Sequence, residues 1–148
     1  KWRFYDAGEK QWSVSTYPQI EFNNPGSHSD DRGLADHGTG LILPLEVMKD
    51  FGVFEFNADF GLVAHSGGNE WFGGVVIGRE VAKGAELAAE LHAEWDHRLG
   101  ASSLVMNLGL RVDLSEKCTL LLSAGRELHN AREAQASLLA YIGLQTRL

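Results

Sequence analysis

Residues 53–64 read Val-Phe-Glu-Phe-Asn-Ala-Asp-Phe-Gly-Leu-Val-Ala, a regular alternation of hydrophobic and other side chains. One side of this stretch is apolar throughout and consists of Phe54, Phe56, Ala58, Phe60, Leu62 and Ala64. The other side carries Val53, Glu55, Asn57, Asp59, Gly61 and Val63. Because successive side chains of a β-strand point to opposite faces, this period of two predicts a strand with one apolar and one largely polar face.

The same period recurs elsewhere along the chain. It appears in residues 11–23, 102–113 and 137–148. Residues 85–97 allow two interpretations, because they are rich in the helix formers Ala, Glu and Leu and place Leu87, Leu91 and Trp95 four residues apart. They also alternate, as do the segments on both sides, and we therefore favour a strand.

The sequence thus predicts an all-β, antiparallel chain of about nine strands in one domain that covers residues 1–148, with no helix longer than a turn. The expected strands are residues 1–6, 11–23, 40–48, 52–64, 71–81, 84–96, 102–113, 117–127 and 137–148. Pro18 falls inside one of them. Because proline cannot donate a hydrogen bond to a sheet, it predicts a bulge or a frayed pairing at that point.

Composition excludes several classes of protein. The 148 residues are 44% hydrophobic and include a single cysteine, Cys118, so the chain is neither a disordered segment nor a disulfide scaffold. We expect Cys118 to be a packing residue. The net charge of −7 and the absence of a basic cluster argue against nucleic acid as a partner. No apolar run is long enough for a transmembrane helix, but β-barrels cross membranes without such runs.

The predicted connections alternate between short and long. The short ones lie at residues 7–10, 49–51, 82–83 and 114–116, and the longer ones at 24–39, 65–70, 97–101 and 128–136. This asymmetry is typical of up-and-down barrels of bacterial outer membranes, which have tight turns on one side and longer loops on the other. Such barrels have an even number of strands, so a count of nine leads to the hypothesis that an odd number of strands precedes Lys1.

Short pieces of the sequence, taken in order, carry a resemblance to a known family. They are Lys1–Phe4, Ser15–Gln19, Leu43–Leu45, Trp71–Gly74 with Gly78–Glu80, Ala89–His92, Asn107–Gly109, Ser123–Arg126 and Tyr141–Gln145. Through most of its length the chain resembles the outer-membrane β-barrel family associated with the meta-pathway of phenol degradation, whose members are often called transporters. The resemblance implies a transmembrane barrel of roughly twelve strands, three of them before Lys1. Leu148 departs from the Phe or Trp that usually ends such proteins.

Alternation does not by itself say which face meets lipid. The apolar faces carry almost no charge, and Trp2, Trp12, Trp71 and Trp95 fall near strand ends, where an aromatic girdle would lie, although packing at the rim of a core is an equal explanation. Both features favour an apolar face that points outward.

In that orientation the polar faces line the lumen of the barrel. The residues that line it are Glu55, Asn57, Asp59, Glu86, Glu90, His92, Glu94, Asn107 and Arg111. An acidic lumen favours cations or neutral solutes over anions. The alternative is a wall whose charges are paired or solvated and which therefore has no selectivity. For strands 71–81 and 117–127 the sequence does not decide which face points outward, because Arg79 and Arg126 lie on their more hydrophobic sides.

Three groups of residues suggest chemistry, and in each the simpler explanation is preferred. A metal site is one interpretation of His28, Ser29, Asp30, Asp31 and His37, and a polar loop is the other. His65 and Ser66 are a base and a nucleophile, but residues adjacent in sequence rarely reach the geometry that a hydrolase needs. Glu90, His92 and Glu94 share one strand face and are better explained as paired lumen charges. We therefore expect no enzyme, no metal and no cofactor.

The sequence as a whole predicts a porin-like barrel of the bacterial outer membrane. It would act as a passive channel or transporter for small solutes, including hydrophobic or aromatic ones, with residues 24–39 as a gate. Its partners would be the lipid bilayer and a small-molecule solute, and no oligomeric state is assigned. Two alternatives stay open: a soluble, lipocalin-like barrel that binds an apolar ligand, and a structural membrane barrel with a plugged lumen.

Overall fold

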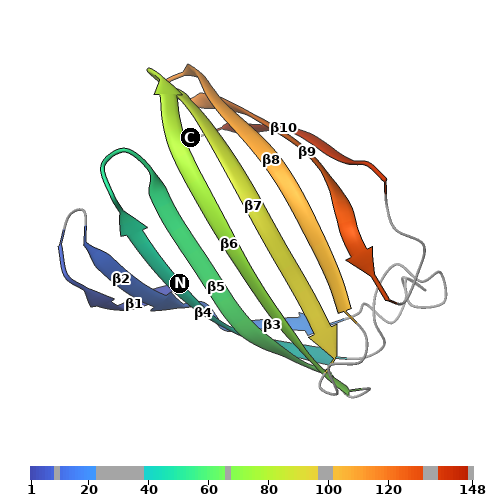
Figure 1. The fold of residues 1–148 in the computed structure, drawn as a ribbon. Coiled ribbons are helices and arrows are strands. Elements are labelled where there is room, and N and C mark those ends of the chain that lie inside the picture. Colours follow the sequence, from blue (N-terminus) through green and yellow to red (C-terminus); the bar gives the residue numbers. More distant parts are fainter. Residues whose placement is uncertain (9–10, 23–38, 66–67, 97–101, 132–136, 147–148) are drawn as a thin grey trace.

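A computed structural model describes residues 1–8, 11–22, 39–65, 68–96, 102–131 and 137–146. These residues form one antiparallel sheet of ten strands, and they contain no helix that is long and apolar enough to span a bilayer (Figure 1). The strands are β1 (Trp2–Asp6), β2 (Trp12–Thr16), β3 (Gln19–Phe22), β4 (Thr39–Asp50), β5 (Glu55–His65), β6 (Gly68–Ala82), β7 (Ala85–Asp96), β8 (Ser102–Ser115), β9 (Cys118–Asn130) and β10 (Leu139–Thr146). The predicted all-β, antiparallel class is confirmed.

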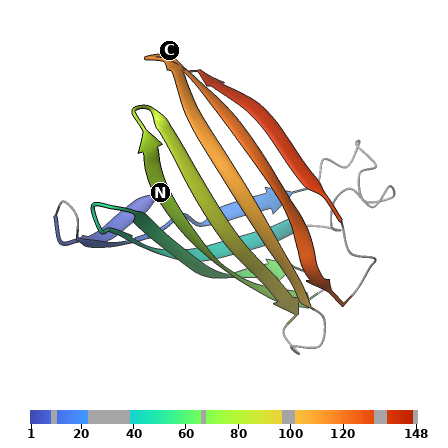
Figure 2. The same ribbon diagram turned by 45° about the horizontal axis from the view of Figure 1, so that its top comes forward.

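The strands follow an up-and-down order, in which each position of the sheet pairs with the next along the chain. The predicted strand 11–23 is interrupted at Tyr17 and Pro18, and its two halves, β2 and β3, both pair with β4. They therefore share one position, so the ten strands occupy the nine positions that the sequence predicts. The sheet does not close on itself, and β1 and β10 are its two edges (Figures 1 and 2).

The ambiguous segment 85–97 is a strand. As β7, it pairs residue by residue with β6 on one side and β8 on the other, through partners such as Leu91↔Val75 and Leu91↔Met106. Two flanking ladders outweigh the helix propensity of Ala, Glu and Leu, because β propensity depends mostly on the neighbours that a strand finds.

One predicted connection is wrong. The sequence predicts a longer loop at residues 65–70, but β5 extends to His65, β6 begins at Gly68, and these two residues are partners in the ladder. Asn69 and Glu70 are polar, yet they continue the strand opposite Ala64 and Val63. The long connection at residues 24–38, proposed as a gate, lies outside the described residues.

The two faces of the sheet differ in exposure, and β4 shows this most plainly. Along β4 the side chains of Leu41, Leu43 and Leu45 are exposed, while the positions between them are more shielded and Glu46 is only 8% exposed. We name the face with the leucines, which continues on β5 with Phe56, Ala58 and Phe60, the apolar face. The opposite face, which carries Glu55, Asn57 and Asp59 on β5, is the polar face.

From this difference in shielding we infer that the polar face lies on the concave side of the curved sheet. Side chains on the concave side converge and shield one another, whereas those on the convex side splay apart. Among the described residues no hydrophobic side chain is buried, and the four buried polar or charged residues are Ser13, Ser15, Glu46 and Thr119. The register places all four on the polar face.

Glycines make room on the polar face for side chains that lie flat across the sheet. A Cβ atom at Gly61 would overlap the ring of Phe72 on the next strand, and one at Gly125 would overlap the side chain of Asn107. Crowded interiors of small barrels are filled in this way. The glycines therefore help to determine how the polar side chains of the candidate site lie.

Candidate functional site

All nine residues that the sequence predicts for a lumen lie on the polar face. The register links Asp59 through Gly74 to His92, Glu86 to Arg111, and Glu90 to Asn107. Glu55 and Asn57 continue the row of Asp59 along β5, and Glu94 continues the row of His92 along β7. The structure thus brings the predicted residues together on one surface of β5–β8.

Carboxylates are sorted completely between the two faces. In the described part of β4–β9, twelve carboxylates lie on the polar face: Glu46, Asp50, Glu55, Asp59, Glu70, Glu80, Glu86, Glu90, Glu94, Asp96, Asp113 and Glu127. The apolar face of the same described strands carries none. Arg111 is the single lysine or arginine on that part of the polar face. The concave surface is therefore strongly negative.

The centre of the polar face holds two small polar clusters. Asn107 donates from Nδ2 to Oε2 of Glu90 over 3.0 Å, across the β7–β8 ladder. A Cβ atom at Gly74 would lie 2.7 Å from Oδ1 of Asp59 and 3.2 Å from Nδ1 of His92, so both side chains lean over this glycine. Nε2 of His92 lies 3.3 Å from Oε1 of Glu94. These contacts hold the side chains close to the sheet rather than extended into the space above it.

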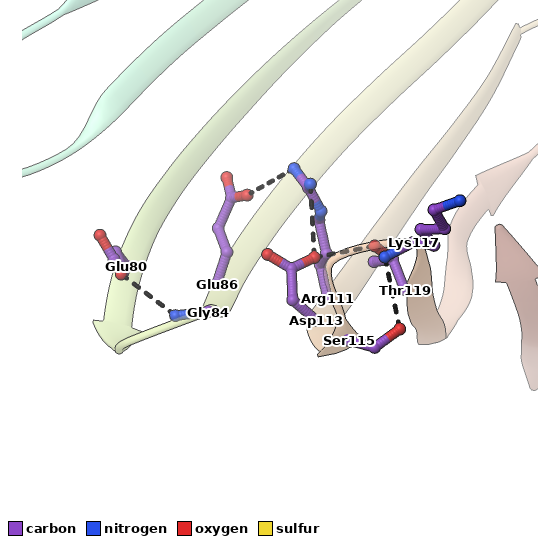
Figure 3. A network of polar contacts seen from close by, with 8 residues as sticks. All are labelled: Glu80, Gly84, Glu86, Arg111, Asp113, Ser115, Lys117 and Thr119. Atoms are coloured by element: carbon purple, nitrogen blue, oxygen red, sulfur yellow. Dashed lines mark hydrogen bonds and ion pairs between the residues drawn. The ribbon is translucent and has the colours of Figure 1, made fainter. Parts of the chain in front are cut away.

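A second network lies near the turns that join β6 to β7 and β8 to β9 (Figure 3). The guanidinium of Arg111 lies 3.8 Å from Oε2 of Glu86 and 3.6 Å from Oδ1 of Asp113. Thr119 donates its hydroxyl to the same oxygen of Asp113 over 2.8 Å. One cation thus bridges two carboxylates from neighbouring strands and partly neutralises them.

This network borders a hollow of about 800 Å³ on the polar face. Its lining combines carboxylates, basic groups and hydrophobic side chains, with Glu55, Glu80, Glu86, Asp113, Arg111 and Phe54 among them. The hollow lies where β5–β8 approach their short turns. Its volume lies within the range of about 300–1,000 Å³ that is usual for small-molecule sites.

The buried carboxylate Glu46 has partners on both sides. Ser15 donates from Oγ to Oε1 of Glu46 over 3.4 Å, and the ammonium of Lys1 forms an ion pair with the same oxygen. Because an unpaired buried charge is costly, these two donors explain how a carboxylate can be 8% exposed on this face.

Aromatic side chains form two groups of ring contacts. The ring of Phe60, in the middle of β5, stacks on Trp71 at 5.3 Å and lies 6.1 Å from Trp95, and both tryptophans lie towards the long connections. In the short connection between β4 and β5, Phe51 stacks on Phe54 at 4.7 Å. Trp12 also lies at the short-turn end, where its partner in the ladder is Lys49.

Trp2 differs from the other three tryptophans in its level along the sheet. It pairs with Thr16, and Thr16 pairs with Leu45 in the middle of β4. Because β1 is short, its terminus is level with the middle of the longer strand. All four tryptophans thus lie near strand ends, as predicted, but Trp2 is level with the middle of β4 and not with the other three.

The register also settles the two strands whose facing the sequence left open. Arg79 pairs with Leu87, and Arg126 pairs with Met106, so both arginines lie on the apolar face. Arg79 is close to the short turn of β6, and Arg126 lies in the half of β9 that leads to the long connection. Arg79 therefore lies near the margin of the apolar face, whereas Arg126 lies two residues from the centre of β9.

Several polar-face residues were missed by the sequence prediction. Glu46, Glu80 and Asp113 belong to the same surface, and the alternation around them in residues 43–47, 77–81 and 110–113 carries the signal. Residues 28–37 and Ser66, considered for chemistry, lie outside the described residues. Cys118 begins β9, is half-buried and pairs with Ser115. The described residues contain no group of His, Cys, Asp and Glu arranged to hold a metal ion.

No protein-family model, curated protein or solved structure matches this chain. A proposal about its function therefore depends on the distribution of charge, apolar surface and shielding described above.

Proposed function

We propose that this sheet is the larger part of a β-barrel in the bacterial outer membrane and that its polar face lines a water-filled passage for small solutes. In this proposal the apolar face meets the hydrocarbon of the bilayer. The barrel acts as a passive channel or transporter, and the chain is not an enzyme.

One observation carries the proposal: the usual relation between hydrophobicity and burial is inverted. Leu108 is 54% exposed and Phe60 is 48% exposed, while Ser15 and Glu46 are 3% and 8% exposed. A water-soluble sheet buries its apolar face, since apolar burial supplies most of the free energy of folding. A membrane barrel points its apolar face outward and keeps a polar interior.

The height of the apolar face suits a bilayer. On β8 it extends from Leu104 to Val112 with an apolar side chain at every second position. Eight steps of about 3.3 Å give about 26 Å along the strand. With the tilt of about 40° that is usual in membrane barrels, this becomes about 20 Å across the membrane, close to the usual apolar band of about 25 Å.

Closure of the barrel requires strands beyond those described. The nine positions alternate in direction, so the edge strands β1 and β10 run parallel to each other. Antiparallel closure then needs an odd number of further strands between them, and the twelve-stranded family that the sequence resembles would supply three. The edges also favour such neighbours, because Trp2 on β1 and Ile142 on β10 are 68% and 75% exposed.

The lumen of this barrel would favour cations and neutral solutes. Twelve carboxylates and one arginine on the polar face of β4–β9 give a negative wall, which raises the local concentration of cations and repels anions. Uncharged aromatic solutes, which the family resemblance implies, are not opposed by this field.

The soluble, lipocalin-like alternative requires the opposite arrangement. In such a barrel the apolar side chains converge on the concave side and form the ligand cavity. Here the hollow of about 800 Å³ is bordered by Glu55, Glu86, Arg111 and Asp113 from the polar face. The polar lining therefore favours the membrane proposal over a site for an apolar ligand.

The test is reconstitution of the full chain into planar lipid bilayers with a KCl gradient across the membrane. We expect discrete conductance steps and a reversal potential that shows preference for K⁺ over Cl⁻. Insertion into the bilayer without conductance would contradict the channel and favour the structural barrel with a plugged lumen. Preference for Cl⁻ would contradict the acidic lumen, and solubility in buffer without detergent would contradict the membrane location.

A further inference from the structure

Most of the basic side chains in the described residues fall into two groups that differ in their partners, and Arg126, on the apolar face of β9, belongs to neither. On the polar face each is paired: Lys1 with Glu46, Arg3 with Asp6, and Arg111 with Glu86 and Asp113. At the short-turn end a second group consists of Lys49, Arg79, Lys83 and Lys117. Among the described residues no carboxylate lies within ion-pair distance of any of these four. The second group therefore presents unneutralised positive charge.

The sequence places a lysine at each short connection. Lys10, Lys49, Lys83 and Lys117 lie beside or within the four connections, and Lys1 is the one lysine elsewhere in the chain. Lys10 lies outside the described residues, but the other three occupy the same end of the sheet, where β4, β6 and β8 end. The positive charge is thus repeated across neighbouring hairpins rather than confined to one.

Lys49 and Arg79 lie on the apolar face itself. Nζ of Lys49 is 5.0 Å from the centre of the Trp12 ring and 4.9 Å from that of Phe51, which holds the ammonium against the outer surface. Arg79 pairs with Leu87, which is 48% exposed on the same face, and Arg79 also borders the hollow near the short turns. Two cations therefore lie at the margin of the surface that we propose to meet lipid.

The carboxylates that neighbour Lys49 and Arg79 in sequence lie on the other face. Glu80 follows Arg79 but lies on the polar face opposite Glu86. Asp50 follows Lys49 and likewise lies on the polar face, opposite Glu55. A lysine or arginine at the edge of an apolar surface is stabilised by a counter-charge. Because Asp50 and Glu80 lie on the polar face, an anion from outside the chain can supply that counter-charge for Lys49 and Arg79.

We propose that the short-turn end binds the phosphate groups of anionic phospholipids, with Lys49 and Arg79 as the contacting residues and Lys83 and Lys117 reaching the same headgroups from the turns. This inference rests on the proposed membrane location. The headgroup layer borders the hydrocarbon, which is where the margin of the apolar face would lie. Basic residues close to an anionic membrane surface each add to binding and are screened by salt.

Two tryptophans at opposite ends of the apolar face allow a direct test in vesicles. In one reporter Trp12 is the single tryptophan (Trp2→Phe, Trp71→Phe, Trp95→Phe), and in the other it is Trp71. Each is reconstituted into phosphatidylcholine vesicles that contain brominated phosphatidylcholine or brominated phosphatidylglycerol, and quenching of tryptophan fluorescence gives the relative binding constant of the two lipids at that end.

At low ionic strength we expect Trp12 to show a preference of about threefold for phosphatidylglycerol, and Trp71 to show about equal binding of the two lipids. Lys49→Gln combined with Arg79→Gln in the Trp12 reporter brings its preference to about equality. Lys1→Gln combined with Arg3→Gln is the matched control, because it also removes one lysine and one arginine, both paired with polar-face carboxylates, and it leaves the preference unchanged.

Two results would overturn the inference while leaving the membrane location intact: an equal preference at both tryptophans, or a preference at Trp12 that survives loss of Lys49 and Arg79. Absence of quenching by either brominated lipid at both tryptophans would instead overturn the membrane location and the inference together. The inference would also be overturned if free inorganic phosphate, at the same ionic strength, abolished the preference for phosphatidylglycerol. The site would then recognise the free anion and not the lipid.

Discussion

On strands β4–β9 the apolar face carries no carboxylate among the described residues and keeps Leu108 and Phe60 about half exposed, whereas the polar face carries twelve carboxylates and shields Glu46 and Thr119 almost fully. Shielding in this sheet therefore follows curvature rather than hydrophobicity. Burial of the apolar face would stabilise the protein, but the described residues leave this face uncovered.

This difference says where stability has to come from. Without a buried hydrophobic side chain in the described residues, the sheet depends on its ladder hydrogen bonds, on the polar contacts of the concave side and on whatever covers the convex side. Substitutions that place a charge on the apolar face are therefore the most informative. The same substitution at the adjacent residue, on the polar face, is the matched comparison.

The largest effect is expected for a charge introduced into the middle of the apolar face. Leu108→Arg would place a guanidinium in hydrocarbon and cost about 2–4 kcal/mol. Asn107→Arg, one residue away on the polar face, would meet Glu90 and be tolerated. Urea titrations of the protein in vesicles measure both, and equal costs for the two variants would remove the distinction between the faces. Phe56→Arg should cost less, about 0–1 kcal/mol, because its ladder partner is Lys49 at the short-turn margin of the apolar face.

A smaller effect is expected from filling the space above a polar-face glycine. In Gly125→Ala the new Cβ would overlap both the Asn107 side chain and the backbone carbonyl of Met106, and we expect a loss of about 1–3 kcal/mol. In Gly109→Ala the nearest atom is 3.8 Å away, so this control should be nearly neutral. Urea titration measures the free energy of unfolding of both variants. A Gly125→Ala protein as stable as the Gly109→Ala control would mean that the polar face is not crowded.

The ion pairs of the short-turn network should contribute less. Glu86→Gln removes the pair with Arg111, whose side chains are 35% and 41% exposed, so solvent screens it and the loss is about 0.5 kcal/mol or smaller. The shift in the urea midpoint measures this loss, and Glu80→Gln serves as a comparison because Glu80 contacts the backbone of Gly84 instead. A loss well above 1 kcal/mol would show that Arg111 is far less hydrated than its exposure indicates.

The smallest change is expected in the selectivity of the proposed channel. Asp59→Asn combined with Glu90→Gln removes two of the twelve polar-face carboxylates and should lower the K⁺/Cl⁻ permeability ratio about twofold, without loss of folding. The reversal potential in a KCl gradient measures the ratio. An unchanged ratio would mean that these carboxylates do not face the permeating ions.

The sequence predicted much of this comparison, because the period of two in residues 53–64 and 102–113 defines the strands and separates Glu55 from Phe56 and Asn107 from Leu108. It did not predict that Asn69 and Glu70 continue β6, since polar residues near glycines are also typical of loops. It left Arg79 and Arg126 open, because their facing depends on the register with Leu87 and Met106 on neighbouring strands.

The side on which the sheet curves was likewise beyond the sequence. Alternation is symmetric, and the same pattern fits a barrel with either face inside. The shielding of Ser15 and Glu46, and the close approach of Asp59 and His92 over Gly74, come from side chains of different strands that converge in space. Such contacts depend on the curvature of the whole sheet.

Accessibility along β8 tests the account most directly. Single cysteines introduced in turn at positions 104–112, with Cys118 replaced by serine, would carry a nitroxide spin label in the protein reconstituted in vesicles. We predict that positions 104, 106, 108, 110 and 112 collide mainly with oxygen, which dissolves in lipid, and that the positions between them collide mainly with a water-soluble nickel complex. An inverted pattern, or one without a period of two, would contradict the assignment of the apolar face to lipid.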